Sequence, residues 1–129
     1  MLKGVASEAD MEKAIRLGMD GVILSNHGGR QLDAGPSTIQ TLRTLRDKYQ
    51  DKITIMMDSG IRSGPDVART LAEGASFTFL GRSFMYGVGA LGSQGALHTM
   101  DLIKTELRQV MEQIGCESIK DLPNFIYKK

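Results

Sequence analysis

Asp58-Ser59-Gly60-Ile61-Arg62-Ser63-Gly64 is the stretch of sequence that decides the fold. It directly follows the apolar run of residues 53–57, which predicts a buried strand, and it precedes Pro65, which is typical of the first turn of a helix. Glycines let backbone N–H groups approach an anion closely, a helix start adds positive partial charge, and an arginine can hold a phosphate with two donors. Gly81-Arg82 follows the next apolar run, residues 77–80, in the same way. The two strand ends therefore predict a phosphate site.

Strand and helix patterns alternate along the rest of the chain. Apolar runs predict strands at residues 21–25, 53–57 and 77–80, and helical patterns fall at residues 7–17, 36–49, 63–74 and 97–114. Strands that are apolar throughout are typical of parallel sheets whose two faces are both buried. We also expect the apolar stripe of the last helix to pack into the core. This pattern fits either an open doubly wound sheet or a barrel of the TIM type.

The predicted phosphate site favours the barrel. No Gly-x-Gly-x-x-Gly motif follows a strand, which disfavours a dinucleotide-binding sheet, whereas TIM barrels commonly bind phosphate after strands 7 and 8. If residues 53–57 and 77–80 are those strands, residues 21–25 form the sixth and Leu2-Lys3 ends the fifth. The expected fold class is α/β, the C-terminal half of a TIM (β/α)8 barrel, roughly strands 5/6 to 8 with their helices. We expect one domain over residues 1–129, and this length agrees with half a barrel, because a whole barrel takes about 250 residues.

Composition narrows the class of partner. Sixteen basic and 15 acidic residues give a formal net charge of +1, which offers no electrostatic reason to bind nucleic acid. The single cysteine, Cys116, excludes an intrachain disulfide, and no apolar run approaches the roughly 20 residues of a membrane span. We therefore expect a cytoplasmic protein that acts on a small molecule, with no metal site.

A second motif carries the chemistry. Ser25-Asn26-His27-Gly28-Gly29-Arg30-Gln31-Leu32-Asp33 directly follows the apolar residues 22–24. His27 can move a proton at neutral pH, and Arg30 can hold a carboxylate with two donors. The glycines let the backbone bend sharply between them. This pairing predicts chemistry on a small organic acid.

Together the motifs make the chain resemble the C-terminal half of the FMN-dependent α-hydroxy acid dehydrogenase/oxidase family, which includes L-lactate dehydrogenases, glycolate oxidases and mandelate dehydrogenases. The resemblance covers nearly all of the 129 residues, and the nine-residue motif from Ser25 to Asp33 is highly specific to the family. It implies that FMN is the cofactor and a lactate-like L-2-hydroxy acid the substrate, oxidised to the 2-oxo acid.

The resemblance also implies a role at each matching position. His27 matches the catalytic base, and Arg30 matches the arginine that binds the substrate carboxylate. Lys3 matches a lysine near the N1/O2 edge of the flavin, where it stabilises the reduced anionic ring, and Ser25 matches a serine that also contacts the flavin. The residues that match ribityl and phosphate contacts are Asp58, Gly60, Arg62, Gly81 and Arg82.

Two departures from the family pattern leave alternatives open. Ser59 stands where many relatives have glycine. The family places substrate-contacting tyrosines, and an aspartate that supports the base, on a first half-barrel that has no counterpart in this sequence. A second hypothesis is therefore a catalytically incomplete half-barrel that binds the FMN phosphate weakly. A third is a module that only self-associates, because the edges of a cut sheet favour pairing into a homo-oligomer. Peripheral attachment of the parent enzyme at the inner membrane also stays open, as do the substrate side chain and the electron acceptor.

Overall fold

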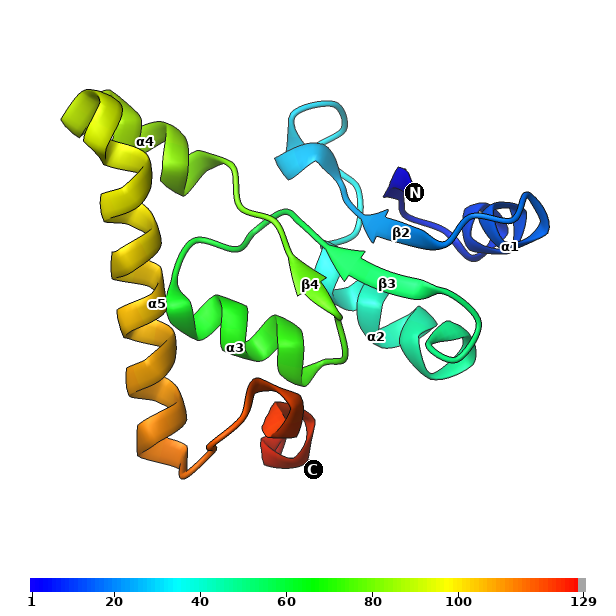
Figure 1. Cartoon of the computed structure of the whole chain (residues 1–129). Helices are drawn as coiled ribbons and strands as arrows, with labels where there is room; N and C mark the ends of the chain where they lie inside the picture. Colours follow the sequence, from blue (N-terminus) through cyan, green and yellow to red (C-terminus); the bar gives the residue numbers. More distant parts are fainter. Residues whose placement is uncertain (128–129) are drawn as a thin grey trace.

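A computed structural model describes residues 1–127 and contains four parallel strands in the order β1-β2-β3-β4. The strands are β1 (Leu2–Val5), β2 (Gly21–Leu24), β3 (Thr54–Met57) and β4 (Phe77–Thr78). One helix connects each strand to the next, namely α1 (Glu8–Arg16), α2 (Thr38–Tyr49) and α3 (Gly64–Ala72) (Figure 1). A doubly wound sheet reverses its strand order at a switch point, and this sheet does not. Its sequential order is that of a barrel wall.

The helices α1, α2 and α3 begin and end within two residues of the predicted bounds. The Ser7 hydroxyl accepts a hydrogen bond from the Asp10 backbone N–H at 3.2 Å and so caps the start of α1. Gln40 Oε1 accepts from the Ser37 N–H at the start of α2, and Pro65 lies in the first turn of α3. Gly18 follows α1 with a φ of 69°, a left-handed conformation that glycine adopts at low cost.

One face of the sheet carries the hydrophobic core. Side chains alternate between faces along a strand, and the alternate residues Val22 and Leu24 of β2 and Ile55 and Met57 of β3 belong to one buried cluster. The helices cover this face. Their main contributions to the cluster are Met11, Ala14, Leu42, Leu45, Tyr49 and Val67.

The opposite face bears a cross-strand row of residues that lie outside this cluster. Strand register pairs Lys3 with Ile23, Ile23 with Met56, and Met56 with Phe77. Ile23 and Met56 are buried, but Phe77 on the edge strand is 56% exposed. The expectation that every strand is buried on both faces is therefore wrong at β4, because no helix of residues 1–127 covers this side of the edge strand. β4 is also shorter than the predicted residues 77–80.

Two helices that form a hairpin follow β4, and the sequence predicts only the second of them. The long helix α5 (Gly95–Ile114) is confirmed, but α4 (Arg82–Leu91) was not expected, since its glycines resemble helix breakers. Gly87 of α4 and Gly95 of α5 serve packing, because an ideal Cβ on Gly95 would lie 2.0 Å from the carbonyl oxygen of Gly87, and one on Gly87 would lie 2.7 Å from the carbonyl oxygen of Gly95. Close approach of the two helices thus requires glycine.

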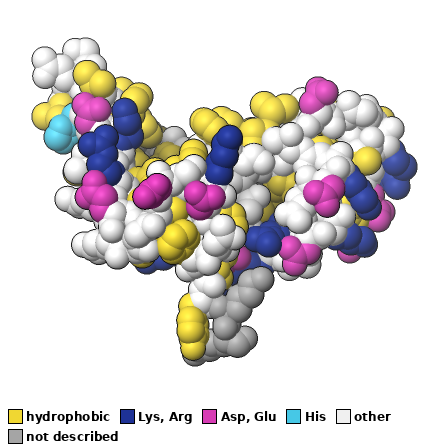
Figure 2. All heavy atoms as spheres, turned by 60° about the horizontal axis from the view of Figure 1, so that its bottom comes forward, with side chains coloured by type: hydrophobic (Ala, Val, Ile, Leu, Met, Phe, Trp, Pro, Cys, Tyr) yellow, Lys and Arg dark blue, Asp and Glu magenta, His cyan; other side chains and the backbone are white. Residues whose placement is uncertain are grey.

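The apolar stripe of α5 is only partly a core stripe. Ile103 is buried, whereas Leu97 and Met100 are exposed, so that expectation is wrong for the first half of the helix. Figure 2 shows hydrophobic side chains at the surface of the end of the molecule where Figure 1 places α4 and the start of α5. The later part of α5 packs on α3, and a final 3-10 helix, η3 (Ile119–Phe125), contributes the buried Leu122 to that packing.

Candidate active site

The carboxyl ends of the strands open into a cleft of about 580 Å³. Parallel strands bring their carboxyl ends to one edge of the sheet, which is where α/β proteins bind ligands. Every site residue predicted from the sequence lines this cleft except Ser25, which hydrogen-bonds to one of them. The predicted residues that line it are Lys3, His27, Arg30, Asp58, Gly60, Arg62, Gly81 and Arg82.

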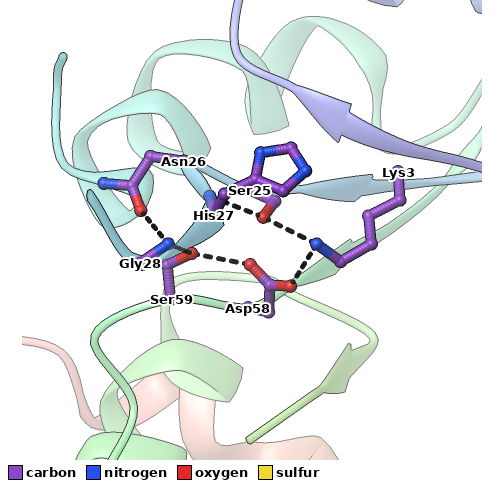
Figure 3. A network of polar contacts seen from close by, with 7 residues as sticks. All are labelled: Lys3, Ser25, Asn26, His27, Gly28, Asp58 and Ser59. Atoms are coloured by element: carbon purple, nitrogen blue, oxygen red, sulfur yellow. Dashed lines mark hydrogen bonds and ion pairs between the residues drawn. The ribbon is translucent and has the colours of Figure 1, made fainter. Parts of the chain in front are cut away.

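A polar network joins the ends of β1, β2 and β3 (Figure 3). The Lys3 ammonium donates to Ser25 Oγ at 3.1 Å and lies 3.0 Å from Asp58 Oδ2. Ser25 is buried, and its hydroxyl oxygen also accepts from the His27 backbone N–H at 3.1 Å. The Lys3 side chain is therefore held in place by residues that follow β2 and β3.

The environment of Asp58 favours its carboxylate form. Partial burial acts to raise the pKa of this carboxyl group. Hydrogen bonds from Ser25, Ser59 and Lys3 lower the pKa, as does the positive charge of Lys3. These contributions outweigh burial, so the pKa of Asp58 lies below its ordinary value. At neutral pH the cleft thus holds a paired Lys3⁺–Asp58⁻ couple.

His27 lies in a left-handed loop over β1. His27 has a φ of 55°, and Gly28 and Gly29 follow at 70° and 73°. A non-glycine residue in this region is uncommon and is typical of functional sites. The imidazole is exposed and lies beside Gly4, where an ideal Cβ would be 3.1 Å from His27 Cε1. The glycine in β1 therefore leaves room for the imidazole ring at the cleft.

Arg30 faces the same cleft from the end of this loop. Arg30 is exposed, and within residues 1–127 it forms no ion pair, with the nearby Asp33 or with any other residue. Its guanidinium is available to a carboxylate beside His27.

The end of the cleft at which the sequence predicts phosphate binding differs from that prediction at one helix start. The sequence suggests that the start of α3 faces an anion, but acidic side chains already occupy its donors. Asp66 Oδ2 accepts from the Arg62 N–H at 3.1 Å, and Glu106 Oε2 of α5 accepts from the Gly64 N–H at 2.7 Å. The start of α4 has no side-chain cap, and it places Gly81 and Arg82 at the cleft. An acidic side chain therefore caps the start of α3, whereas the start of α4 at the cleft has no side-chain cap.

Sequence reasoning missed several residues of the site. Ser59, noted only as a departure from the family pattern, bridges two loops by hydrogen bonds to Gly28 and Asp58. Glu106 lies 42 residues from the Gly64 N–H that it caps, and no local pattern signals such a contact. Phe79 and Met85 line the cleft as apolar residues, which carry no chemical signature in a sequence.

Residues 1–127 contain no group of three or more His, Cys, Asp or Glu side chains placed to hold a metal ion. Over the same residues, no helix combines the length and apolar character that a membrane crossing needs.

Comparison with known proteins places the chain in a family. A family model described as FMN-dependent dehydrogenase matches residues 1–128. An L-lactate dehydrogenase of Vibrio cholerae serotype O1 (strain M66-2) is 45% identical over 122 residues, which are 95% of this chain and 32% of that protein. An L-lactate dehydrogenase of Acinetobacter baumannii (strain AYE) is 43% identical over the same share of each chain.

Solved structures agree on the fold. A soluble mutant of the membrane-associated (S)-mandelate dehydrogenase from Pseudomonas putida superposes with a TM-score of 0.91 at 39% identity, covering 99% of this chain and 37% of that chain. A mandelate oxidase structure gives a TM-score of 0.89 at 35% identity, covering 95% and 38%. The chain spans about a third of the length of the curated relatives that it matches. Its four parallel strands correspond to that part of a TIM-barrel FMN dehydrogenase, and the chain belongs to the FMN-dependent dehydrogenase family.

Proposed function

We propose that this chain forms the base-bearing and phosphate-binding part of a site that oxidises a lactate-like L-2-hydroxy acid to the 2-oxo acid with FMN. The observation that carries the proposal is the single cleft that gathers His27 with the cationic side chains Lys3, Arg30, Arg62 and Arg82. A hydroxy acid and a flavin phosphate are both anions, and a site for the pair needs cations at two places beside one proton acceptor.

The residues of the cleft suit FMN. Arg62, Gly81 and Arg82 would hold the phosphate at the uncapped start of α4. Asp58 and Gly60 would contact the ribityl chain, and Lys3 with Ser25 would contact the ring. The chemistry that bound FMN would supply is the acceptance of two electrons and of the one proton that His27 does not take.

His27 and Arg30 supply the remaining requirements. Oxidation of HO–C2–H to C2=O removes two protons and two electrons from the substrate. A neutral His27 imidazole accepts one of those protons, while Arg30 holds the carboxylate and so fixes the position of C2. The ammonium of Lys3, held in place by Asp58, offsets negative charge that develops beside it.

A catalytically incomplete half-barrel is the second candidate. The His27 imidazole has no hydrogen bond or ion pair to a carboxylate within residues 1–127, and the chain spans about a third of its relatives. A base without an orienting partner is a weaker base. In this alternative the chain binds the FMN phosphate weakly or only self-associates.

An anaerobic flavin experiment separates the two candidates. The purified chain is mixed with FMN, unbound flavin is removed, L-lactate is added, and the flavin absorbance is followed. Retained flavin that bleaches supports oxidation by the chain itself. Retained flavin that does not bleach supports the half-barrel that binds phosphate, and loss of all flavin contradicts FMN binding by this chain. In a complete barrel with these residues, His27→Ala should abolish turnover and leave FMN bound.

A further inference from the structure

Ser59 adopts a backbone conformation that a serine does not favour. Its φ is 73°, in the left-handed region that glycine tolerates and a side chain makes costly. Gly60 follows at 78°, so the chain turns sharply at this point. A strained serine persists where its surroundings hold it, and such positions cluster at functional sites.

The hydroxyl of Ser59 connects two loops, since it donates one hydrogen bond and accepts another (Figure 3). It has one hydrogen, which it donates to Asp58 Oδ1 at 2.7 Å, because an ionised carboxylate only accepts. Its oxygen accepts from the Gly28 backbone N–H at 3.1 Å, across 31 residues of sequence. The loop that carries His27 is thereby attached to the carboxylate that pairs with Lys3.

We propose that Ser59 is a positioning residue, which fixes the His27–Gly28–Gly29 loop against the end of β3 and thereby sets the place of the His27 imidazole. The Gly28 peptide is held on both sides, since its N–H bonds to Ser59 and its carbonyl accepts from Arg82 Nη2 at 3.1 Å. Asn26 Oδ1 also accepts from the Gly28 N–H, but that bond is local to the loop. The bond to Ser59 ties the loop to another strand. The assignment of His27 as the base rests on the proposed function, whereas the position of the loop does not.

Two substitutions separate the hydroxyl from the backbone strain. Ser59→Gly removes the hydroxyl and relieves the left-handed φ, so its melting temperature should equal or exceed that of the wild type. Ser59→Ala removes the hydroxyl and keeps the strain. Ser76→Ala, at an exposed serine before β4, is the matched control.

The experiment is NMR on the full, ligand-free chain. In both Ser59 variants we expect the Gly28 amide to exchange roughly fivefold faster, the factor for one lost hydrogen bond. We also expect a weaker nuclear Overhauser effect between His27 Hε1 and the Gly4 Hα protons, since the imidazole lies beside Gly4. Carboxyl titration of Asp58 should move to higher pH.

Unchanged Gly28 exchange and an unchanged His27–Gly4 signal in a folded Ser59→Gly variant would overturn the proposal. Should Ser59→Ala fail to fold, Ser59→Gly still decides the matter. Failure of the wild-type chain to retain FMN would overturn the proposed function instead, because the NMR measurements use no flavin.

Discussion

The Arg82 guanidinium donates a hydrogen bond to the backbone carbonyl of Gly28, with 3.1 Å between Nη2 and the oxygen. Arg82 begins α4 at the phosphate-like end of the cleft, and Gly28 adjoins His27. The approach is close, because an ideal Cβ on Gly28 would lie 2.8 Å from Arg82 Nη2. The two ends of the site are thus in direct contact, and the positive φ of Gly28, 70°, favours glycine where they meet.

Arg82→Ala should weaken FMN binding more than His27→Ala does. A charge-assisted hydrogen bond to phosphate contributes about 1.5–3 kcal/mol, so the dissociation constant should rise about 10- to 150-fold. His27→Ala removes no phosphate donor and should leave the affinity nearly unchanged. Flavin fluorescence titration measures both. Arg82→Lys is the control, since it keeps the charge and loses the forked geometry, and it should fall between the two. Equal affinities for Arg82→Ala and His27→Ala would contradict the phosphate assignment.

Local patterns predicted the elements of this fold with a boundary error of about a residue at most positions. Ser7, Ser37 and Pro65 mark helix starts through chemistry that acts within one turn, which a sequence displays directly. α4 was missed because Gly87 and Gly95 are there for contact between helices, and such a contact exists only in three dimensions. The prediction that the whole apolar stripe of α5 is buried failed for the same reason. Periodicity shows which face of a helix is apolar, but not which element covers it.

The candidate site followed from the sequence through its charged and glycine-rich strand ends. The contacts between residues far apart in the sequence could not be predicted from it. Nothing near Gly64 in the sequence reveals that Glu106 caps its N–H, and this bond leaves the start of α4, not that of α3, without an acidic cap at the cleft. Ser59 looked like a mild departure, although its hydroxyl joins two loops.

Asp58 should make the chain sensitive to acid. Its pKa in the folded chain lies below the unfolded value of about 3.9, so folding favours the ionised form. The resulting stabilisation is complete above about pH 5 and is lost as the pH falls through the folded pKa. Urea midpoints measured from pH 7 to pH 3 should therefore fall more steeply for the wild type than for Asp58→Asn. Asp51→Asn, at an exposed aspartate after α2, should behave like the wild type. Parallel curves for the wild type and Asp58→Asn would refute this role of the carboxylate.

Gly64→Ala should destabilise the contact between α3 and α5. An ideal Cβ on Gly64 would lie 2.2 Å from the Leu107 backbone nitrogen and 2.5 Å from Glu106 Cβ. Because the nearest atom belongs to the backbone of a long helix, relief requires the helices to separate, and we expect a loss of about 2–3 kcal/mol in the free energy of unfolding. Chemical denaturation measures it. Gly89→Ala in α4 is the matched control, since nothing lies within 4 Å of its Cβ position, and it should be neutral or stabilising by up to about 1 kcal/mol. Equal stability of the two variants would show that the helices are not in close contact at Gly64.

The chain should self-associate through the exposed edge strands of its sheet. Phe77 and Phe79 lie at the β4 edge with ring centroids 5.1 Å apart, and both are exposed, as is Leu2 on the opposite edge strand. Exposed apolar edge strands favour pairing between chains, and a charge placed on such an edge opposes it. Light scattering across a dilution series should therefore give a mass above that of one chain, and Phe77→Lys should lower it toward the monomer. Leu17→Lys places the same charge on an exposed apolar residue at the end of α1, away from the sheet edge, and should leave the mass unchanged. A monomer at every wild-type concentration would mean that the edge is protected without a partner. A response to Leu17→Lys equal to that of Phe77→Lys would place the contact elsewhere.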